Sequence, residues 1–199
     1  MTFRVLLASR NPKKLDELRR IFAPALADLE VVGLDDVEHY DEVPESGATF
    51  AENALIKARE GYRHTGLPTV ADDSGLAVDA LNGMPGVLSA RWAGGHGDDE
   101  ANLRLVLSQV RDVPDERLGA VFACSVAYVA GGGVEIMTAG RMPGRLVRDP
   151  RGTNGFGYDP IFVPDGQAVT SAELDSSEKD AISHRGQALR ALADQLEGE

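Results

Sequence analysis

Short apolar runs alternate with one-sided helical patterns along the first part of this chain. Residues 3–8 form an apolar run that only Arg4 interrupts, which predicts a strand. Asn11 then suits the N-cap of a helix, and Pro12 suits its first turn, where the missing N–H costs nothing. That helix places four large apolar side chains on one face: Leu15, Leu18, Ile21 and Phe22.

The same alternation continues toward the middle of the chain. An apolar run at 29–34 predicts a second strand. Thr49 as N-cap, with Glu52 reaching back, fits a capping box at the start of the next helix. Asn53 and Lys57 lie four residues apart in that helix and therefore share a face. The sequence leaves open whether this face makes Lys57 a second cation for phosphate or a solvated surface residue.

The second half of the chain carries a hairpin pattern and two more helices. Two alternating segments, 119–130 and 134–140, flank three glycines and predict a β-hairpin. A helix is expected at 98–111, where apolar residues recur at helical spacing. We also expect a short strand at 161–163 and a last helix beginning near Ser183.

Together these elements predict an α/β fold. We expect a mixed central sheet flanked by helices, arranged as two lobes around a cleft, within a single domain spanning residues 1–199. The segment 83–92 is too rich in glycine and proline for regular structure. Its Trp92, the only tryptophan, could be a lid, a packing anchor or an interface residue.

Charge is distributed unevenly along the chain. The formal net charge of −12 disfavours general affinity for nucleic acid or for an anionic membrane surface, because either polyanion would repel the protein. Six of the 20 basic residues nevertheless lie in the first 20 positions, whereas residues 35–45 contain six acidic residues and no Lys or Arg. The composition is therefore compatible with a local site for a polyphosphate.

Cysteine content and hydropathy limit the classes of protein to which this chain could belong. Cys124 is the only cysteine, which excludes an intramolecular disulfide and a cysteine-rich metal site, and its apolar surroundings predict a core position. The first apolar run is too short for a secretory signal, and no window approaches the roughly 18 apolar residues of a spanning helix. We expect a soluble protein of the cytoplasm.

Two adjacent carboxylates, Asp72 and Asp73, follow the apolar run 67–71 and precede Ser74 and Gly75. If a strand ends there, the acids lie at the rim of a sheet, where ligands bind in open α/β folds. At such a rim they could hold a divalent cation or accept a proton. Asp, Ser and Gly are also the ordinary turn formers, so these four residues alone are equally consistent with a plain turn.

Two further segments contain side chains suited to a nucleotide. Four polar or basic residues surround the start of the first helix, where free amides and the helix dipole attract anions: Ser9, Asn11, Lys13 and Lys14. An ordinary capped surface helix is the alternative. A glycine-rich loop at 151–160 holds two aromatic side chains suited to stacking on a base, although it has neither the Walker lysine nor the third glycine of a dinucleotide fingerprint. His184 and Arg185 could face the same anion or base.

Four motifs in order match one known family. Residues 9–14 fit its Thr/Ser-x-Asn-x-x-Lys start, 71–76 fit its ADDSGL motif, 155–160 fit its GFGYDP loop, and 183–186 complete the set. The chain resembles the noncanonical purine nucleoside triphosphate pyrophosphatases, the inosine/xanthosine triphosphatase or HAM1-like family, from about residue 3 to residue 196.

The resemblance implies an activity and a set of roles. It implies hydrolysis of dITP, ITP and XTP to the nucleoside monophosphate and pyrophosphate, with Mg²⁺ as cofactor, in a homodimer that cleanses the nucleotide pool. Glu45 and Asp73 match the metal-binding acids, and Asp73 also matches the general base. With the residues singled out above, the candidate substrate-binding set is Ser9, Asn11, Lys13, Lys14, Lys57, Ser74, Phe156, Gly157, Tyr158, Asp159, Lys179, His184 and Arg185.

Two alternative functions would use the same pocket. One is hydrolysis of a different nucleotide, such as a modified pyrimidine triphosphate. The other is a nucleotide sensor without chemistry, which would need neither Glu45 nor Asp73. The sequence alone leaves open whether Asp72 shares the metal-binding or base role with Asp73.

Overall fold

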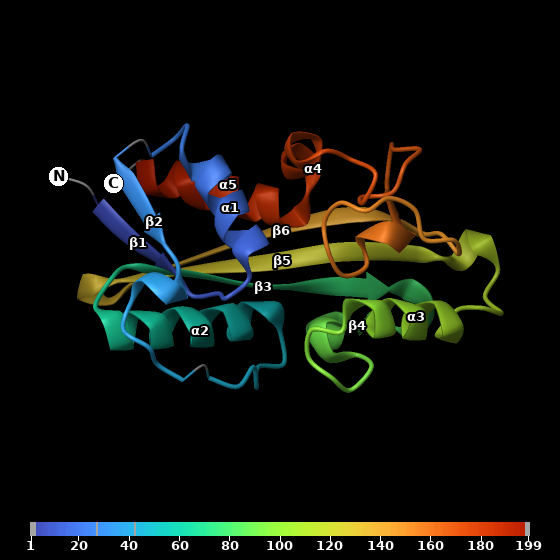
Figure 1. Ribbon diagram of the computed structural model, residues 1–199, viewed down its shortest axis with the longest axis horizontal. Helices are drawn as coiled ribbons and strands as arrows, with labels where there is room; N and C mark the ends of the chain where they lie inside the picture. Colours follow the sequence, from blue (N-terminus) through green and yellow to red (C-terminus); the bar gives the residue numbers. More distant parts are fainter. Residues whose placement is uncertain (1–2, 27, 42, 198–199) are drawn as a thin grey trace. The chain divides into compact units, whose positions relative to one another are not determined.

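The structure, a computed structural model, describes residues 3–26, 28–41 and 43–197. In this part of the chain the strands form a seven-stranded sheet in the order β2-β1-β3-β5-β6-β7, with β4 paired to β3 (Figure 1). The strands are β1 (Phe3–Leu7), β2 (Leu29–Val32), β3 (Thr69–Val78), β4 (Met84–Pro85), β5 (Gly119–Ala130), β6 (Val134–Leu146) and β7 (Phe162–Pro164). The helices are α1 (Pro12–Phe22), α2 (Phe50–Thr65), α3 (Asp99–Gln109), α4 (Ser176–Ile182) and α5 (His184–Glu197).

The sheet is mixed, as predicted. Strand β1 runs parallel to both β2 and β3, whereas β4 is antiparallel to β3 and β7 is antiparallel to β6. The chain divides into two compact units. Unit 1 consists of Met1–Asp73, Cys124–Gly140 and Arg185–Glu199, and unit 2 consists of Ser74–Ala123 and Arg141–His184. This division agrees with the expected two lobes, and the cleft stays a prediction.

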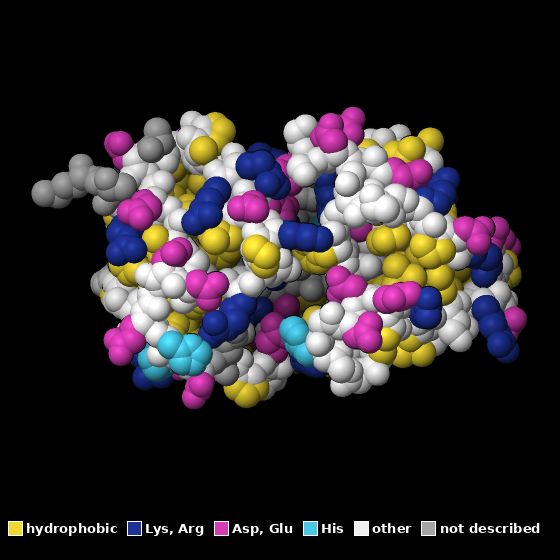
Figure 2. Space-filling model, viewed as in Figure 1, with side chains coloured by type: hydrophobic (Ala, Val, Ile, Leu, Met, Phe, Trp, Pro, Cys, Tyr) yellow, Lys and Arg dark blue, Asp and Glu magenta, His cyan; other side chains and the backbone are white. Residues whose placement is uncertain are grey.

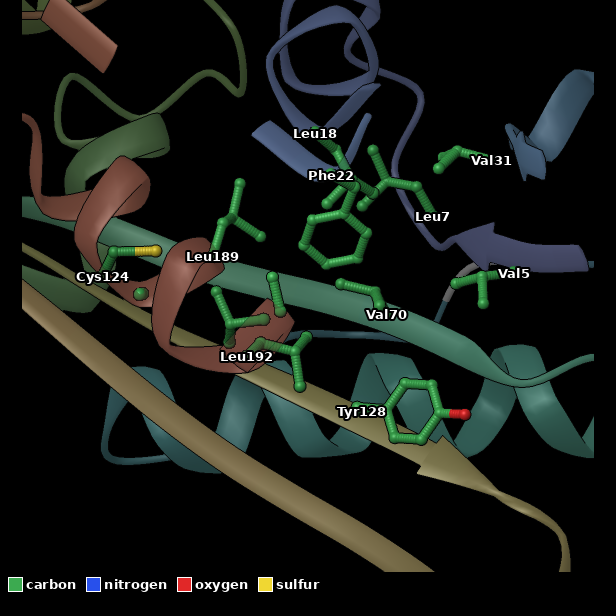
Figure 3. Packing of buried hydrophobic residues seen from close by; sticks show 13 residues of the cluster. Val5, Leu7, Leu18, Phe22, Val31, Val70, Cys124, Tyr128, Leu189 and Leu192 are labelled. Atoms are coloured by element: carbon green, nitrogen blue, oxygen red, sulfur yellow. The ribbon is translucent and has the colours of Figure 1, made fainter. Parts of the chain in front are cut away.

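Unit 1 has helices on both faces of its strands (Figure 1). Helices α1 and α5 pack on one face, where Figure 3 shows their side chains converging with those of the strands around Phe22. Helix α2 packs on the other face through Ala54 and Ala58, which contact Ala71 and Ala127. Small residues on α2 allow the helix to approach the sheet closely. Each face is therefore closed by its own apolar cluster.

The helix starts of unit 1 follow the sequence signals. The Asn11 side chain accepts a hydrogen bond from the backbone N of Lys13 (3.0 Å), and Pro12 is the first residue of α1. Thr49 caps α2 by accepting from the backbone N of Glu52 (3.2 Å). The Glu52 carboxylate accepts from the backbone N of Ala48 (2.6 Å) rather than from Thr49, so the return bond of the box forms one residue earlier than predicted.

The predicted strand end at Ala71 is wrong. Strand β3 continues through Asp72 and Asp73 to Val78, so the two acids lie within a ten-residue strand and the reading of 72–75 as a plain turn also fails. The strand continues because Leu76 and Val78, both fully buried, belong to the apolar cluster of unit 2. Residues 72–75 interrupt the apolar run of β3 but leave its backbone extended.

Unit 2 departs from the sequence predictions in three places. Strand β6 extends six residues beyond the predicted 134–140, to Leu146. Segment 83–92, expected to be irregular, contains β4 and the 3₁₀ helix Gly86–Arg91. Helix α4 was not predicted, although Asp175 and Glu178 form a capping box at its start, with reciprocal hydrogen bonds of 2.8 and 3.0 Å.

Two open predictions about single side chains are answered. Cys124 is buried and free in the apolar cluster of unit 1, as expected, and burial raises the pKa of its thiol. Trp92 packs against the apolar cluster of unit 2, and its Nε1 donates to Oε1 of Gln109 (2.8 Å), which makes it a packing anchor. Within the described ranges, no helix combines the length and the apolar character needed to cross a bilayer.

The Phe22 side chain tests the packing of α1 onto the sheet. Phe22 is 1% exposed in the apolar cluster of unit 1. We expect Phe22→Ala to lower the free energy of unfolding by about 3–5 kcal/mol, because it removes buried surface and leaves a cavity. Urea denaturation measures this loss. Phe3→Ala is the matched control, since Phe3 is 50% exposed in the same unit and should change stability little. Equal losses in the two variants would contradict the packing described.

Candidate active site

Asp72 and Asp73 are consecutive residues of β3 and therefore point to opposite faces of the sheet. The two residues before them alternate in the same way, since Val70 packs with α1 and α5 and Ala71 packs with α2. Asp72 contacts side chains from α1 and α5, and Asp73 contacts side chains from α2. The adjacent acids thus belong to two separate polar clusters.

The Asp72 cluster is a buried network of four charged side chains. Oδ2 of Asp72 lies 2.9 Å from Nζ of Lys14 and accepts a hydrogen bond from Nε of Arg185 (3.1 Å). Nη1 of Arg185 donates to Oε2 of Glu17 (3.1 Å). Lys14 and Glu17 are three residues apart on α1 and share a face. Two acids and two bases make this network neutral as a whole, which offsets the cost of burying the charges.

The surrounding charges keep Asp72 ionised. Burial works to raise the pKa of Asp72, but the positive charges of Lys14, Arg185 and Lys57 lower it by more, so the pKa lies well below its ordinary 3.8. The pKa of Arg185 is correspondingly raised, because the charges of Asp72 and Glu17 outweigh its burial. Asp72 is therefore a fixed anion that is difficult to protonate.

The Asp73 cluster lies on the opposite face, against α2. Nδ2 of Asn53 donates to Oδ2 of Asp73 (2.9 Å), and Nζ of Lys57 lies 3.8 Å from Oδ1 of Asp73. The same Nζ donates to Oε1 of Glu45 (2.8 Å). The side chain of Lys57 is 17% exposed, so the shared face of Asn53 and Lys57 points inward and the solvated alternative for Lys57 is wrong.

Asp73 differs from Asp72 in its tendency to take a proton. Burial raises the pKa of Asp73 above its ordinary 3.8, with a smaller contribution from the charge of Glu45. The charge of Lys57 and the hydrogen bond from Asn53 offset only part of this rise. Burial lowers the pKa of Lys57, but the nearby acids raise it by more, so Lys57 stays a cation. Asp73 is thus the more proton-accepting acid of the pair.

Glu45 and Asp73 offer the donor atoms of a divalent cation site. Both carboxylates approach the same Lys57 ammonium, so their oxygens converge around one positive charge. Hard cations take such oxygens together with water and substrate oxygens. Among the described residues, no group of three or more His, Cys, Asp or Glu side chains is arranged to hold a metal ion. A cation held by these two carboxylates would complete its coordination with ligands from outside the protein.

The glycine-rich loop of unit 2 is organised around Asp159. Oδ2 of Asp159 accepts from the backbone N of Phe156 (2.8 Å) and from Nζ of Lys179 (2.5 Å). Lys179 also lies over the Phe156 ring, 5.4 Å from its centroid. Gly155 has a φ of +73°, and a side chain there would collide with the Asp159 carboxylate, which explains the glycine. Loop, acid and lysine form one preorganised group.

The same loop is tied to the rest of unit 2 by two further bonds. The backbone N of Gly157 donates to Oδ2 of Asp99 at the start of α3 (2.8 Å), and the Tyr158 hydroxyl donates to the carbonyl of Ser89 (2.8 Å). Burial raises the pKa of Tyr158, so its hydroxyl stays a neutral donor. A cavity of about 580 Å³ lies between α3 and the loop, with Phe156 in its lining.

The remaining predicted residues occupy varied positions. Ser9 accepts from the backbone N of Asn11 (3.2 Å) at the start of α1, where Lys13 is exposed. Ser74 is half-buried and begins unit 2. The buried His184 ring stacks on Phe122, with 4.9 Å between centroids. The structure therefore brings the predicted residues together as local groups within each unit.

Among the described residues, one further cavity has no predicted site residue in its lining. A cavity of about 640 Å³ in unit 1 is lined by Arg4, Arg19 and Phe22, among others, and includes none of the candidates. On the face shown in Figure 2, acidic and basic side chains are interspersed. The Lys and Arg side chains visible on this face therefore do not form a single patch.

Sequence reasoning missed two partners and left a third unassigned. Glu17 was not a candidate, because nothing in the sequence of α1 indicates that Arg185 is the partner of Glu17. Asp99 was likewise missed, since it reads as an ordinary helix-start acid. The sequence indicated only that Asn53 shares a helix face with Lys57. This spacing was the one available signal, because both side chains contact Asp73 in the structure.

The Asp72 network predicts a pH-dependent contribution to stability. We expect Asp72→Asn to lower the free energy of unfolding by about 3–5 kcal/mol at pH 7, because it leaves buried cations without their partner. The lowered pKa means that the contribution of Asp72 is present above its ordinary value of 3.8 and declines as the pH falls below that value. Urea denaturation of both proteins between pH 7 and pH 3 should show the difference shrinking only at the acidic end.

Asp35→Asn is the control for this experiment. Asp35 lies in the same unit, 3.7 Å from Arg10, with its side chain 93% exposed, so its removal should change stability little at any pH. An Asp72→Asn protein as stable as the parent at pH 7 would show that the network is not a stabilising one.

Comparison with known proteins places the chain in a family. The Ham1 family profile matches residues 5–195. The "dITP/XTP pyrophosphatase" of Nocardia farcinica is 63% identical over 202 residues, covering 98% of each chain. The crystal structure of the nucleoside-triphosphatase / dITP/XTP pyrophosphatase of Mycobacterium abscessus is 61% identical, with a TM-score of 0.78 and coverage of 96% of this chain and 98% of that one. A HAM1 protein of Coxiella burnetii is 40% identical, with a TM-score of 0.88 and coverage of 99% and 100%. This chain belongs to the Ham1 family.

Proposed function

We propose that this chain hydrolyses the noncanonical purine nucleoside triphosphates dITP, ITP and XTP to the nucleoside monophosphate and pyrophosphate. The observation that carries the proposal is the cluster of Glu45, Lys57 and Asp73, in which a buried proton-accepting acid lies beside a cation and a second carboxylate. The relatives named dITP/XTP pyrophosphatase support the substrate class. A sensor without chemistry would need neither carboxylate.

The start of α1 is suited to the triphosphate. Asn11 already caps the helix, so the Ser9 hydroxyl, the helix-start amides and the Lys14 ammonium are the groups proposed to bind phosphate oxygens. Lys14 is held 2.9 Å from Asp72, which keeps its ammonium in place before substrate binds. Phosphoryl reactions depend chiefly on such charge neutralisation and positioning.

Asp73 is the proposed general base. Its raised pKa favours taking a proton from the attacking water, while Asn53 and Lys57 fix its carboxylate from two sides. We do not assign this role to Asp72, because two cations hold it ionised on the other face of β3. The proton then resides on Asp73 until it is lost to solvent.

Mg²⁺ is the proposed cofactor, held by Glu45 and Asp73. Bound there with substrate phosphate oxygens, it would neutralise developing charge and make its water more acidic. Lys57, which contacts both acids, would then be free to approach a phosphate oxygen.

The loop of unit 2 is proposed to recognise the base. The Phe156 ring offers a stacking surface, and Tyr158 and Asp159 hold the loop in shape. The ammonium of Lys179, which lies over the Phe156 ring in the same unit, is the donor proposed to face the 6-keto oxygen of hypoxanthine or xanthine. Adenine would leave this donor unpaired, at a cost of about 1–3 kcal/mol, or roughly 5- to 150-fold in preference.

Product analysis tests the reaction. The purified protein with dITP and Mg²⁺ should release pyrophosphate and dIMP, because attack is proposed at the α-phosphorus. Chromatography of the nucleotides with a pyrophosphate assay measures both products. Release of orthophosphate and dIDP would contradict the proposal, and equal rates on ITP and ATP would remove the claimed selection for the 6-keto group. Faster turnover of a modified pyrimidine triphosphate would favour the alternative substrate class.

Asp73→Asn tests the base. We expect turnover to fall by about 10²- to 10⁴-fold, the usual contribution of a general base, while nucleotide affinity changes little. Steady-state kinetics and calorimetric titration with ITP separate the two effects. An Asp73→Asn protein with near-parental turnover would move the base role to another residue.

We further propose a homodimer that acts in the cytoplasm, where nucleotide pools are used. The family resemblance supports the dimer. Light scattering should give a mass near twice the 21.2 kDa of one chain. A mass of one chain at every concentration tested would rule the dimer out.

A further inference from the structure

The side chain of Asn53 joins the two acidic segments of unit 1. Asn53 is 0% exposed and lies in the first turn of α2. Its Nδ2 donates to Oδ2 of Asp73 (2.9 Å), and its Oδ1 accepts from the backbone N of Gly47 (2.8 Å). Gly47 is two residues from Glu45. One buried amide thus connects the strand that carries Asp73 with the segment that carries Glu45.

The chemistry of the partners fixes which way this amide points. A carboxylate only accepts hydrogen bonds, and a backbone N–H only donates them. Turning the Asn53 amide over would place its oxygen against Asp73 and its NH₂ against the Gly47 N–H, which would break both bonds. An amide is therefore required, since a carboxylate would repel Asp73 and an alkyl side chain would satisfy neither partner.

The segment of Glu45 approaches α2 so closely that Gly47 has no room for a side chain. A Cβ on Gly47 would lie 2.7 Å from Oδ1 of Asn53 and 2.6 Å from Cβ of Glu52, both closer than such atoms pack. The glycine allows the backbone to reach the Asn53 oxygen. The position of Glu45 is therefore set by a contact to the same residue that holds Asp73.

Lys57, one turn further along α2, also connects the two acids, through its positive charge. It contacts Glu45 at 2.8 Å and Oδ1 of Asp73 at 3.8 Å, while Asn53 binds the other oxygen of Asp73. If Lys57 turns toward a substrate phosphate, as proposed above, Asn53 is the neutral group that still connects Asp73 with the segment of Glu45.

We propose that Asn53 is a positioning residue that sets the distance and orientation of Glu45 and Asp73 for a shared divalent cation. This inference rests on the proposed function. Partners of metal ligands of this kind commonly change metal affinity or activity by about 10- to 100-fold when they are removed. In this account Asn53 contacts neither the nucleotide nor the cation and acts through Asp73 and the segment of Glu45.

The test compares Asn53→Ala with the parent protein by two independent readouts. The first is the Mg²⁺ concentration for half-maximal dITP hydrolysis, which should rise by about 10- to 100-fold. The second is binding of Mn²⁺ alone, followed by the electron paramagnetic resonance of the free ion, and its dissociation constant should rise similarly. The KM for dITP at saturating Mg²⁺ should change little, and high Mg²⁺ should restore part of kcat.

Asn102→Ala is the matched control. Asn102 is also a buried helical asparagine, 1% exposed in α3, and its Oδ1 accepts from the backbone N of Ala93 (2.7 Å). Its Nδ2 has no hydrogen-bond partner among the described residues, and no carboxylate depends on it. Its removal should lower thermal stability without changing either metal readout. If Asn102→Ala shifted both metal readouts, loss of any buried amide would be sufficient to weaken metal binding, and the proposal would be overturned.

A second variant keeps the proposal testable if Asn53→Ala does not fold. Gly47→Ala leaves Asn53 and Asp73 intact but pushes the Glu45 segment away, so it should also weaken Mn²⁺ binding. Metal readouts within twofold of the parent in either variant would overturn the inference. A parent protein that binds Mn²⁺ but releases no pyrophosphate from dITP would instead refute the proposed function, and the Mn²⁺ comparison would still decide the role of Asn53.

Discussion

Consecutive residues of a β-strand must point to opposite faces of the sheet, and this constraint divides the polar chemistry of unit 1. Asp72 faces α1 and α5, where Lys14 and Arg185 neutralise it. Asp73 faces α2, where Asn53 and Lys57 hold it. A strand end or turn at these residues would have left both acids in one solvated loop. Because β3 continues past them, each acid acquires its own surroundings and its own task.

The neighbouring acids have opposite electrostatics, which agrees with the different roles proposed for them. Around Asp72 the added positive charges outweigh burial and lower its pKa, whereas around Asp73 burial outweighs the partly shared charge of Lys57 and raises its pKa. The first arrangement gives a fixed anion that holds Lys14, the lysine proposed to bind phosphate. The second gives a carboxylate able to accept a proton. Divergent shifts in adjacent groups are a common way to separate such roles.

Local features were predictable from the sequence, and long-range ones were not. The cap at Asn11 was predictable because its hydrogen bond spans only two residues, and strand β1 was predictable from its run of apolar residues. The course of β3 was misread because the partners that satisfy Asp72 are distant in sequence, with Arg185 113 residues away. The motifs identified Glu45 and Asp73 as candidates and the helical spacing singled out Lys57, yet only the structure shows that one ammonium contacts both acids. The role of Asn53 was hidden because an asparagine in a first helical turn is ordinary.

The central claim is that a water molecule attacks the α-phosphorus of the nucleotide. Hydrolysis of dITP in oxygen-18 water, with mass spectrometry of both products, tests it most directly, because the attacking oxygen stays on the phosphorus it strikes. The account predicts that the label appears in dIMP and that the pyrophosphate stays unlabelled. Label in the pyrophosphate would place the attack at the β-phosphorus and contradict the arrangement proposed for Glu45, Asp73 and Lys14.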